Sequence, residues 1–205
     1  MIATEKSITV YAESTPNPVA MKFVANIMLV ENEAVLHYAN QQAAIGQSPL
    51  AEMLFNFPFI NDVFISGNFI TLTKNNLAHW EDVMLEIREF LKDYLVTQKP
   101  ILSTTLAATT HATDIDATIA SQHASPTTDV EKKIIAVLEE YIRPAVEQDG
   151  GLITFKSFKN GVVALELQGS CKGCPSASLT LKAGIEGLLK RMIPEVQEVV
   201  SEAMQ

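Results

Sequence analysis

Residues 97–128 constrain the fold most, because they carry no pattern that could form a packed element. They include nine threonines, six alanines and almost no charge, and neither a helical nor an alternating apolar pattern runs through them. We therefore expect a flexible linker between two small domains, residues 1–96 and residues 129–205. His111 and His123 lie in this linker. We expect both to be solvated, because no partner that could orient a metal ligand lies nearby.

The segment after the linker predicts two helices. Thr128 and Glu131 have the spacing of a capping box, which starts a helix whose end region is marked by Pro144. The second helix ends before Pro194. Its expected core stripe recurs at helical spacing, at Leu181, Ile185, Leu188 and Met192.

Between these helices the sequence predicts a small sheet. Asp149–Gly151 breaks the chain, and Leu152–Phe158 is expected to form the first strand. Asn160-Gly161 is a strong signal for a two-residue hairpin turn. A second strand follows with inward apolar residues at Val163, Leu165 and Leu167, and Val196–Val200 can add a third strand. The C-terminal domain is therefore predicted to be α+β, a small sheet packed by two helices.

The N-terminal domain also predicts an α+β fold. Its helices are expected from Ser48 as N-cap with Pro49 behind it, and along an apolar stripe from Trp80 to Tyr94. Its expected strands are Ile8–Ala12, Met21–Val30, a short strand at Phe64 and Ile65, and Phe69–Thr73. His37 and His79 match no catalytic pattern.

Cys171 and Cys174 are the chain's two cysteines, and their spacing carries the chemistry. Pro175 suits the first position of a helix, which would place Cys174 at or beside the N-cap. The positive end of the helix dipole there favours thiolate over thiol. Two thiolates are half of a four-ligand metal or iron–sulfur site. The pair therefore either works alone as a dithiol or is completed by a second copy of the chain, on a loop expected at the domain surface.

Composition narrows the function further. The net charge of −9 argues against nucleic acid as the main partner, since phosphate binding needs a basic face. No apolar run approaches the ~18 residues of a membrane span, and no signal or transit peptide is recognisable, so a cytoplasmic location is expected. A Gly-rich phosphate loop, G-x-S-x-G and HExxH are all missing from the sequence, and we expect no enzyme activity.

Two stretches of sequence resemble one family. Residues 139–198, above all GSCKGCPSASLTLKAGIEGLLKRMIPEV and the preceding DGG, look like the C-terminal domain of the NifU-like (Nfu-type) iron–sulfur carrier proteins. Residues 11–96, with STPNPVAMKFVAN, resemble the N-terminal domain that accompanies it in one branch. The resemblance implies that Cys171 and Cys174 ligate a cluster shared by two subunits, usually [4Fe–4S] and otherwise [2Fe–2S]. It also implies delivery to apo iron–sulfur client proteins and contact with upstream assembly machinery.

The number of cysteines also predicts that two chains share the cluster. Two thiolates per chain cannot saturate a four-iron cluster, so the cluster-bound form is expected to be a homodimer. Two alternatives stay open. The CxxC could act as a dithiol in thiol–disulfide exchange, or two chains could share a structural zinc ion through four cysteines.

Overall fold

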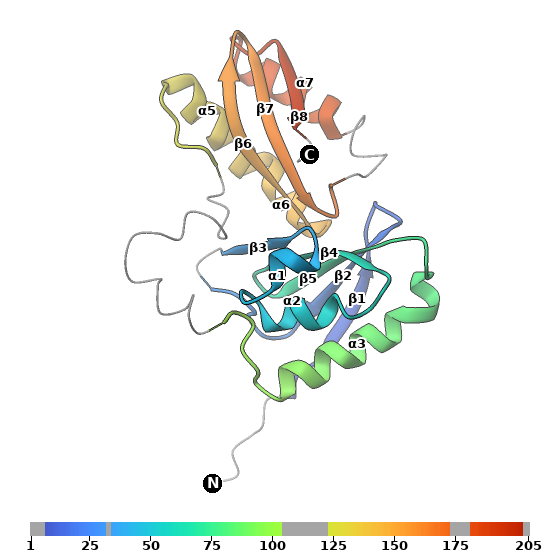
Figure 1. The fold of residues 1–205 in the computed structure, drawn as a ribbon. Coiled ribbons are helices and arrows are strands. Elements are labelled where there is room, and N and C mark those ends of the chain that lie inside the picture. The colour runs from blue at the N-terminus through green and yellow to red at the C-terminus, as the bar shows by residue number, and fades with distance from the viewer. Residues whose placement is uncertain (1–6, 32–33, 104–122, 173–180, 203–205) are drawn as a thin grey trace.

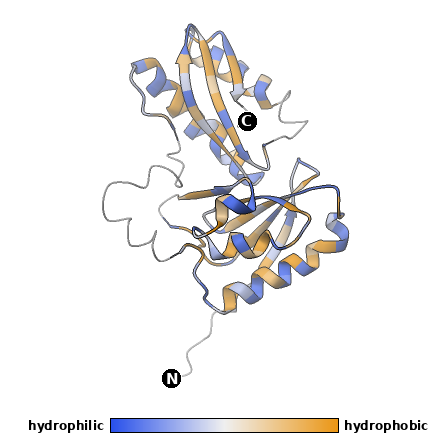
Figure 2. Cartoon of the chain, in the orientation of Figure 1, coloured by the Kyte–Doolittle hydropathy of each residue, from blue (hydrophilic) through white to orange (hydrophobic). Residues whose placement is uncertain are grey.

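A computed structural model describes residues 7–31, 34–103, 123–172 and 181–202. Within them the chain forms two sheets, each with its own helices (Figure 1), and the predicted α+β fold class is confirmed. Figure 2 shows hydrophobic residues running along β6 and β7 and alternating with hydrophilic ones along α3. None of the described helices is long and apolar enough to cross a membrane.

The N-terminal sheet is five-stranded and antiparallel, in the order β1-β2-β5-β4-β3. Its strands are β1 (Val10–Ser14), β2 (Ala20–Ala25), β3 (Val35–Tyr38), β4 (Ile60–Ser66) and β5 (Phe69–Lys74). Helices α1 (Gln41–Ala44), α2 (Pro49–Leu54) and α3 (Trp80–Val96) cover one face of it (Figure 1).

The local signals in this domain act as expected, with shifts at strand ends. The Ser48 hydroxyl accepts from the Ala51 amide at 3.2 Å, with Pro49 at the first helical position. β2 ends at Ala25, earlier than predicted, because the Leu29 and Val30 amides turn to the Gly67 carbonyl instead of continuing the ladder. The short strand β3 was not expected from the sequence.

The C-terminal sheet is three-stranded, with β7 in its centre. β6 (Gly151–Lys159) and β7 (Val162–Gly169) form the expected hairpin, and β8 (Glu198–Glu202) lies parallel to β7. Positive φ angles of 52° at Asn160 and 81° at Gly161 make the tight turn, which is why this dipeptide is a reliable hairpin signal.

Three helices and a π-helical turn complete this domain. They are α5 (Asp129–Val137), the π-helical turn Leu138–Ile142, α6 (Arg143–Gln148) and α7 (Lys182–Met192). The capping box of Thr128 and Glu131 is present as predicted. The prediction for Pro144 is wrong, because the helical chain continues past it to Gln148. The π-helical turn directly before α6 places Pro144 in a first turn, where its missing N–H costs little.

Two further sequence predictions are wrong. In α7 the expected stripe is wrong at Met192, which is 45% exposed near the helix end, whereas Ile185 is buried and Leu181 and Leu188 pack against the core as predicted. His123 is not solvated, because its Nδ1 accepts from the Phe155 amide at 2.8 Å and its Nε2 lies 2.5 Å from Glu139. Burial raises the pKa of Glu139, but hydrogen bonds from Arg143 and His123 outweigh burial and bring this pKa below its ordinary value.

The C-terminal domain stands on the face of the N-terminal sheet that the helices leave open (Figure 1). Val24, Phe64 and Phe69 of that face form one buried apolar cluster with Val35 and with Leu152 of β6. This contact explains why β2 is buried at every position, on both faces of the sheet.

Candidate metal centre

Cys171 lies two residues after the end of β7, and it is buried. Its side chain is 8% exposed and belongs to the apolar core of the C-terminal domain. The expectation that the cysteine loop lies at the surface is therefore wrong for Cys171. Cys174 and the expected helix start at Pro175 lie outside the described residues and stay predictions.

Gly151, the first residue of β6, makes room for the Cys171 sulfur. A Cβ atom on Gly151 would lie 2.6 Å from the Sγ of Cys171, closer than packed atoms tolerate. The loop is fastened to the same turn by Ser170, whose amide donates to the Gly150 carbonyl at 3.1 Å and whose hydroxyl donates to the Asp149 carbonyl at 2.6 Å. The Asp149–Gly151 segment thus shapes the thiol's surroundings in addition to breaking the chain.

A side chain of the N-terminal domain holds the backbone on both sides of Cys171. The side-chain Nδ2 of Asn17 donates to the Ser170 carbonyl at 2.9 Å and to the Lys172 carbonyl at 3.3 Å. Asn17 is 1% exposed. Its own turn orients it, because its Oδ1 accepts from the Val19 amide at 3.2 Å.

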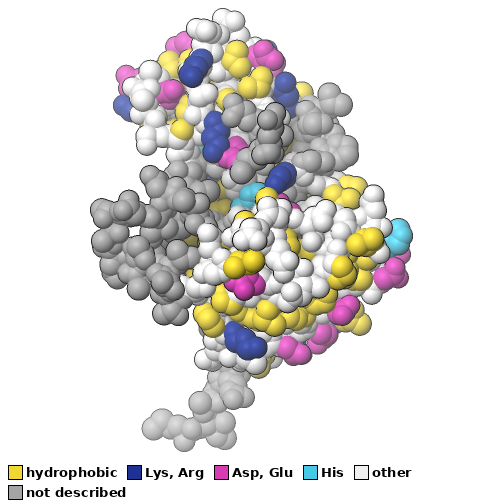
Figure 3. Space-filling view, viewed as in Figure 1, with side chains coloured by type: hydrophobic (Ala, Val, Ile, Leu, Met, Phe, Trp, Pro, Cys, Tyr) yellow, Lys and Arg dark blue, Asp and Glu magenta, His cyan; other side chains and the backbone are white. Residues whose placement is uncertain are grey.

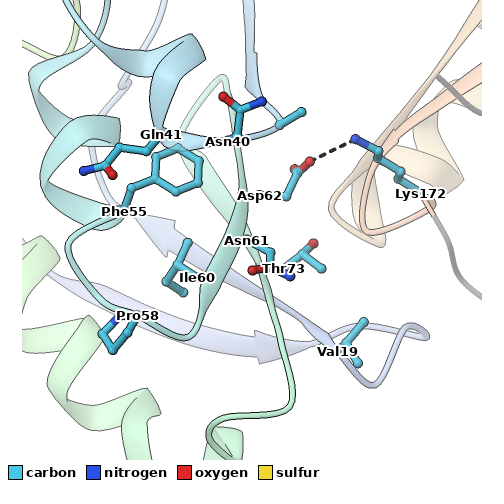
Figure 4. A pocket seen from close by; sticks show the side chains of 11 residues that line it. Val19, Asn40, Gln41, Phe55, Pro58, Ile60, Asn61, Asp62, Thr73 and Lys172 are labelled. Atoms are coloured by element: carbon cyan, nitrogen blue, oxygen red, sulfur yellow. Dashed lines mark hydrogen bonds and ion pairs between the residues drawn. The ribbon is translucent and has the colours of Figure 1, made fainter. Parts of the chain in front are cut away.

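Lys172, which lies between the two cysteines in sequence, forms an ion pair with the N-terminal domain. Its Nζ lies 3.2 Å from the Oδ2 of Asp62 in β4 (Figure 4). The same oxygen is 2.8 Å from the Nε2 of His37. Basic, acidic and histidine side chains can be seen together between the two domains in Figure 3. His37 is thus a structural partner of a carboxylate, although sequence spacing alone gave no sign of it.

A cavity of about 580 Å³ opens beside this ion pair. Lys172 and Asp62 line it together with apolar side chains such as Phe55 and Ile60 (Figure 4). The cavity gives solvent a route to the ion pair at the domain boundary.

The donor that the structure describes at this position is one soft sulfur, packed in the apolar core of its domain. Thiolate sulfur suits iron–sulfur clusters and zinc, but the place that a Gly151 side chain would take is already filled by the Cys171 sulfur. Within the described residues, no group of three or more His, Cys, Asp and Glu side chains could hold a metal ion. Cys171 and Cys174 stay the predicted ligand pair.

Comparison with known proteins gives consistent matches for both domains. The family model "Scaffold protein Nfu/NifU N terminal" matches residues 10–98, and the model "NifU-like domain" matches residues 134–200. The curated proteins named "NFU1 iron-sulfur cluster scaffold homolog, mitochondrial" from Drosophila ananassae and Drosophila willistoni are 34% and 33% identical over 95% and 97% of this chain. The chain spans 64% and 65% of their length, slightly under two thirds.

Among solved structures, a NifU-like protein from Saccharomyces cerevisiae matches with a TM-score of 0.41 and 22% identity, over 50% of this chain and 91% of that one. The two sequence models together define the class: a protein with an Nfu/NifU N-terminal domain followed by a NifU-like domain. Both domains thus match models of NifU-like and Nfu-type proteins, as the sequence resemblance predicted.

The sequence located the cysteines but missed the residues that hold their loop. Asn17 contacts Ser170 and Lys172 across 153 and 155 positions of chain, and Asp62 contacts Lys172 across 110. One signal pointed to this contact: the proline-flanked turn around Asn17 is part of the N-terminal segment that carries the family resemblance.

Proposed function

We propose that this chain binds an iron–sulfur cluster as cargo and delivers it to apo-proteins. Cys171 and Cys174 supply the ligands, and two copies of the chain share the cluster, most readily a [4Fe–4S] cluster. The observation that supports this most is the two-thiol motif in a segment that matches the NifU-like domain model. The relatives' printed names, iron-sulfur cluster scaffold, point the same way.

Delivery follows from ligand chemistry in this proposal. A client thiol replaces a carrier thiolate at iron, and its proton ends on the released carrier sulfur. Two ligands per chain make the cluster easier to release than four ligands from one chain would. The partners are a second copy, apo iron–sulfur client proteins and upstream assembly machinery, and the chain itself catalyses no reaction. The cytoplasmic location expected from the sequence stays a prediction.

Anaerobic reconstitution with iron and sulfide tests the proposal. We expect an absorption band near ~400 nm, about two irons per chain and the mass of a dimer, as a four-thiolate cubane requires. Cys171→Ser and Cys174→Ser should each abolish stable binding while circular dichroism shows a folded chain. Ser157→Ala, in β6 away from the loop, should load normally.

The same measurement separates the alternatives. A colourless monomer with a reversible Cys171–Cys174 disulfide would replace the proposal with dithiol redox chemistry. A zinc-bound dimer in which iron and sulfide cannot displace zinc would replace it with a structural zinc site. A stoichiometric cluster in the Cys171→Ser variant would contradict the ligand assignment.

A further inference from the structure

The contacts between the two domains converge on the backbone around Cys171. Besides Asn17, which lies in the turn between β1 and β2, two side chains of the N-terminal sheet donate to backbone carbonyls of residues 147–150. The Lys22 ammonium donates to the Glu147 and Gln148 carbonyls at 3.1 and 3.0 Å, at the carbonyl end of α6 where a positive charge is favourable. The Thr71 hydroxyl donates to the Gly150 carbonyl at 2.7 Å.

These donors are buried, so their hydrogen bonds cannot be exchanged for water while the domains stay together. Thr71 is 1% exposed and Lys22 is 9% exposed, with the Lys22 ammonium also 4.6 Å from the ring centre of Phe69. A buried donor that loses its partner costs free energy. The interface therefore favours one arrangement of the domains.

The C-terminal domain is shaped to receive these donors. Gly150 has a φ of +79°, and a Cβ atom there would lie 2.7 Å from the Thr71 hydroxyl and 3.2 Å from the Lys22 Cδ. Leu152, 1% exposed, completes the apolar cluster with Phe64 and Phe69. The hydrogen bond from Thr71, the apolar contact of Leu152 and the close approach at Gly150 thus all lie within three residues of chain. Gly151, in the same stretch, packs against the Cys171 sulfur.

This arrangement does not present Cys171 to a second chain. Its sulfur lies against Gly151 in the core of its own domain, the carbonyls of Ser170 and Lys172 accept from Asn17, and the Lys172 ammonium is paired with Asp62. A cluster shared by two chains needs the sulfur at a surface that faces the second copy.

We propose that the N-terminal domain is an intramolecular cover for the cysteine loop and that the cover is released when the loop takes up its cluster. The release step rests on the proposed function, whereas the cover itself does not. A cargo that binds only the uncovered loop shifts the equilibrium toward it, and the cover in turn lowers the apparent affinity of the loop for its cargo. The cover therefore favours transfer of the cluster to a client protein.

The reactivity of the Cys171 thiol tests the cover in cluster-free protein. In a Cys174→Ser background Cys171 is the remaining thiol of the chain. Asn17→Asp keeps the oxygen that accepts from Val19 but replaces the donor by an oxygen that repels the Ser170 and Lys172 carbonyls. We expect alkylation of Cys171 to become at least about fivefold faster, the factor implied by one lost hydrogen bond of ordinary strength.

A matched control exists in the same domain. Asn26 likewise accepts from a backbone amide, that of Thr9, and donates to a carbonyl, that of Ser7, but away from the interface. Asn26→Asp should leave the alkylation rate unchanged. Lys22→Met, with Lys74→Met as its control on β5, repeats the comparison if Asn17→Asp does not fold. Equal rates in wild type and in a folded interface variant would overturn the cover.

Carbodiimide crosslinking tests the release. Asp62 and Lys172 line the cavity, so the reagent can reach them and join them while the domains are closed. The pair Glu186 and Lys190 within α7, 2.5 Å apart, serves as internal control. We expect the Asp62–Lys172 product to fall several-fold on cluster loading while the control product stays constant.

An undiminished Asp62–Lys172 product in fully loaded protein would overturn the release. Failure of the proposed function looks different, because no cluster would then bind at all, and the alkylation result would still decide whether the cover exists.

Discussion

At the scale of single residues, small side chains decide what the cysteine loop can do. Gly150 and Gly151 are adjacent, yet they serve different neighbours: one admits Thr71 from the other domain, and the other admits the Cys171 sulfur. Sequence reasoning identified both as a chain break, because a glycine pair signals a turn but does not reveal which atoms lie where a side chain would be.

Gly151→Ala tests this packing. The added Cβ would meet the Cys171 sulfur at 2.6 Å, so we expect a loss of about 1–3 kcal/mol in the free energy of unfolding, the usual cost of overpacking. Urea denaturation measures it. Gly184→Ala is the control, because Gly184 lies in α7 with nothing within 4 Å of an added Cβ, and it should raise stability by about 0.5–1 kcal/mol. Equal effects of the two substitutions would contradict the packing argument.

At the scale of elements, local signals predicted the structure well wherever they were complete. The Ser48 and Thr128 caps and the Asn160-Gly161 turn appear as expected, because each depends on a few neighbouring residues. β3 was missed because a four-residue strand at a sheet edge depends on its partner β4 more than on its own sequence. The prediction that the helix ends near Pro144 failed because the spacing of apolar residues does not predict the π-helical turn before it.

The capping box of α5 predicts a pH effect on stability. Hydrogen bonds from the hydroxyl and the amide of Thr127, followed by those from Thr128, lower the pKa of Glu131 below its ordinary value of 4.5. A lowered folded-state pKa means that Glu131 stabilises the fold fully above its unfolded-state pKa, and that this stability is lost as pH falls through the folded-state value. The stability difference between wild type and Glu131→Gln should therefore shrink as pH falls below about 4.5.

Urea denaturation of both proteins at neutral and acidic pH measures this difference. Glu195→Gln, at an exposed position outside the capping box, is the control substitution. A difference that stays constant down to the lowest pH at which both proteins fold would contradict the assignment to Glu131. Thr128→Ala should cost about 1 kcal/mol at neutral pH, as loss of an N-cap usually does.

At the scale of the whole molecule, the interface between the domains was beyond sequence reasoning. The residues that form it are far apart, as Asn17 and Ser170 are by 153 positions, and each carries a local pattern that suits an ordinary turn or strand. The cysteines could be identified because their spacing is itself the signal. The contacts on either side of Cys171 could not be identified, because packing of one domain on another leaves no period in the sequence.

Coupling between the domains can be measured with the chain's single tryptophan, Trp80, which lies in the N-terminal domain. Leu152 belongs to β6 but is buried against the N-terminal sheet. We expect Leu152→Ala to lower stability by about 2–4 kcal/mol and to shift the unfolding transition reported by Trp80 fluorescence. A Trp80 transition that stays in place, while circular dichroism shows the C-terminal domain weakened, would mean that the domains unfold independently.

Both ends of the inter-domain segment are attached to the domains that they join. The Ser48 hydroxyl donates to the Ile101 carbonyl at 2.6 Å, and the Ala124 amide donates to the Phe155 carbonyl at 2.8 Å. Such a tether keeps the two partners of an intramolecular contact at a local concentration that dilution cannot change, typically about millimolar. Pairing of two chains around a cluster does depend on total protein. The proposed balance between closed monomer and loaded dimer is therefore set by protein abundance, with scarce protein favouring the closed form.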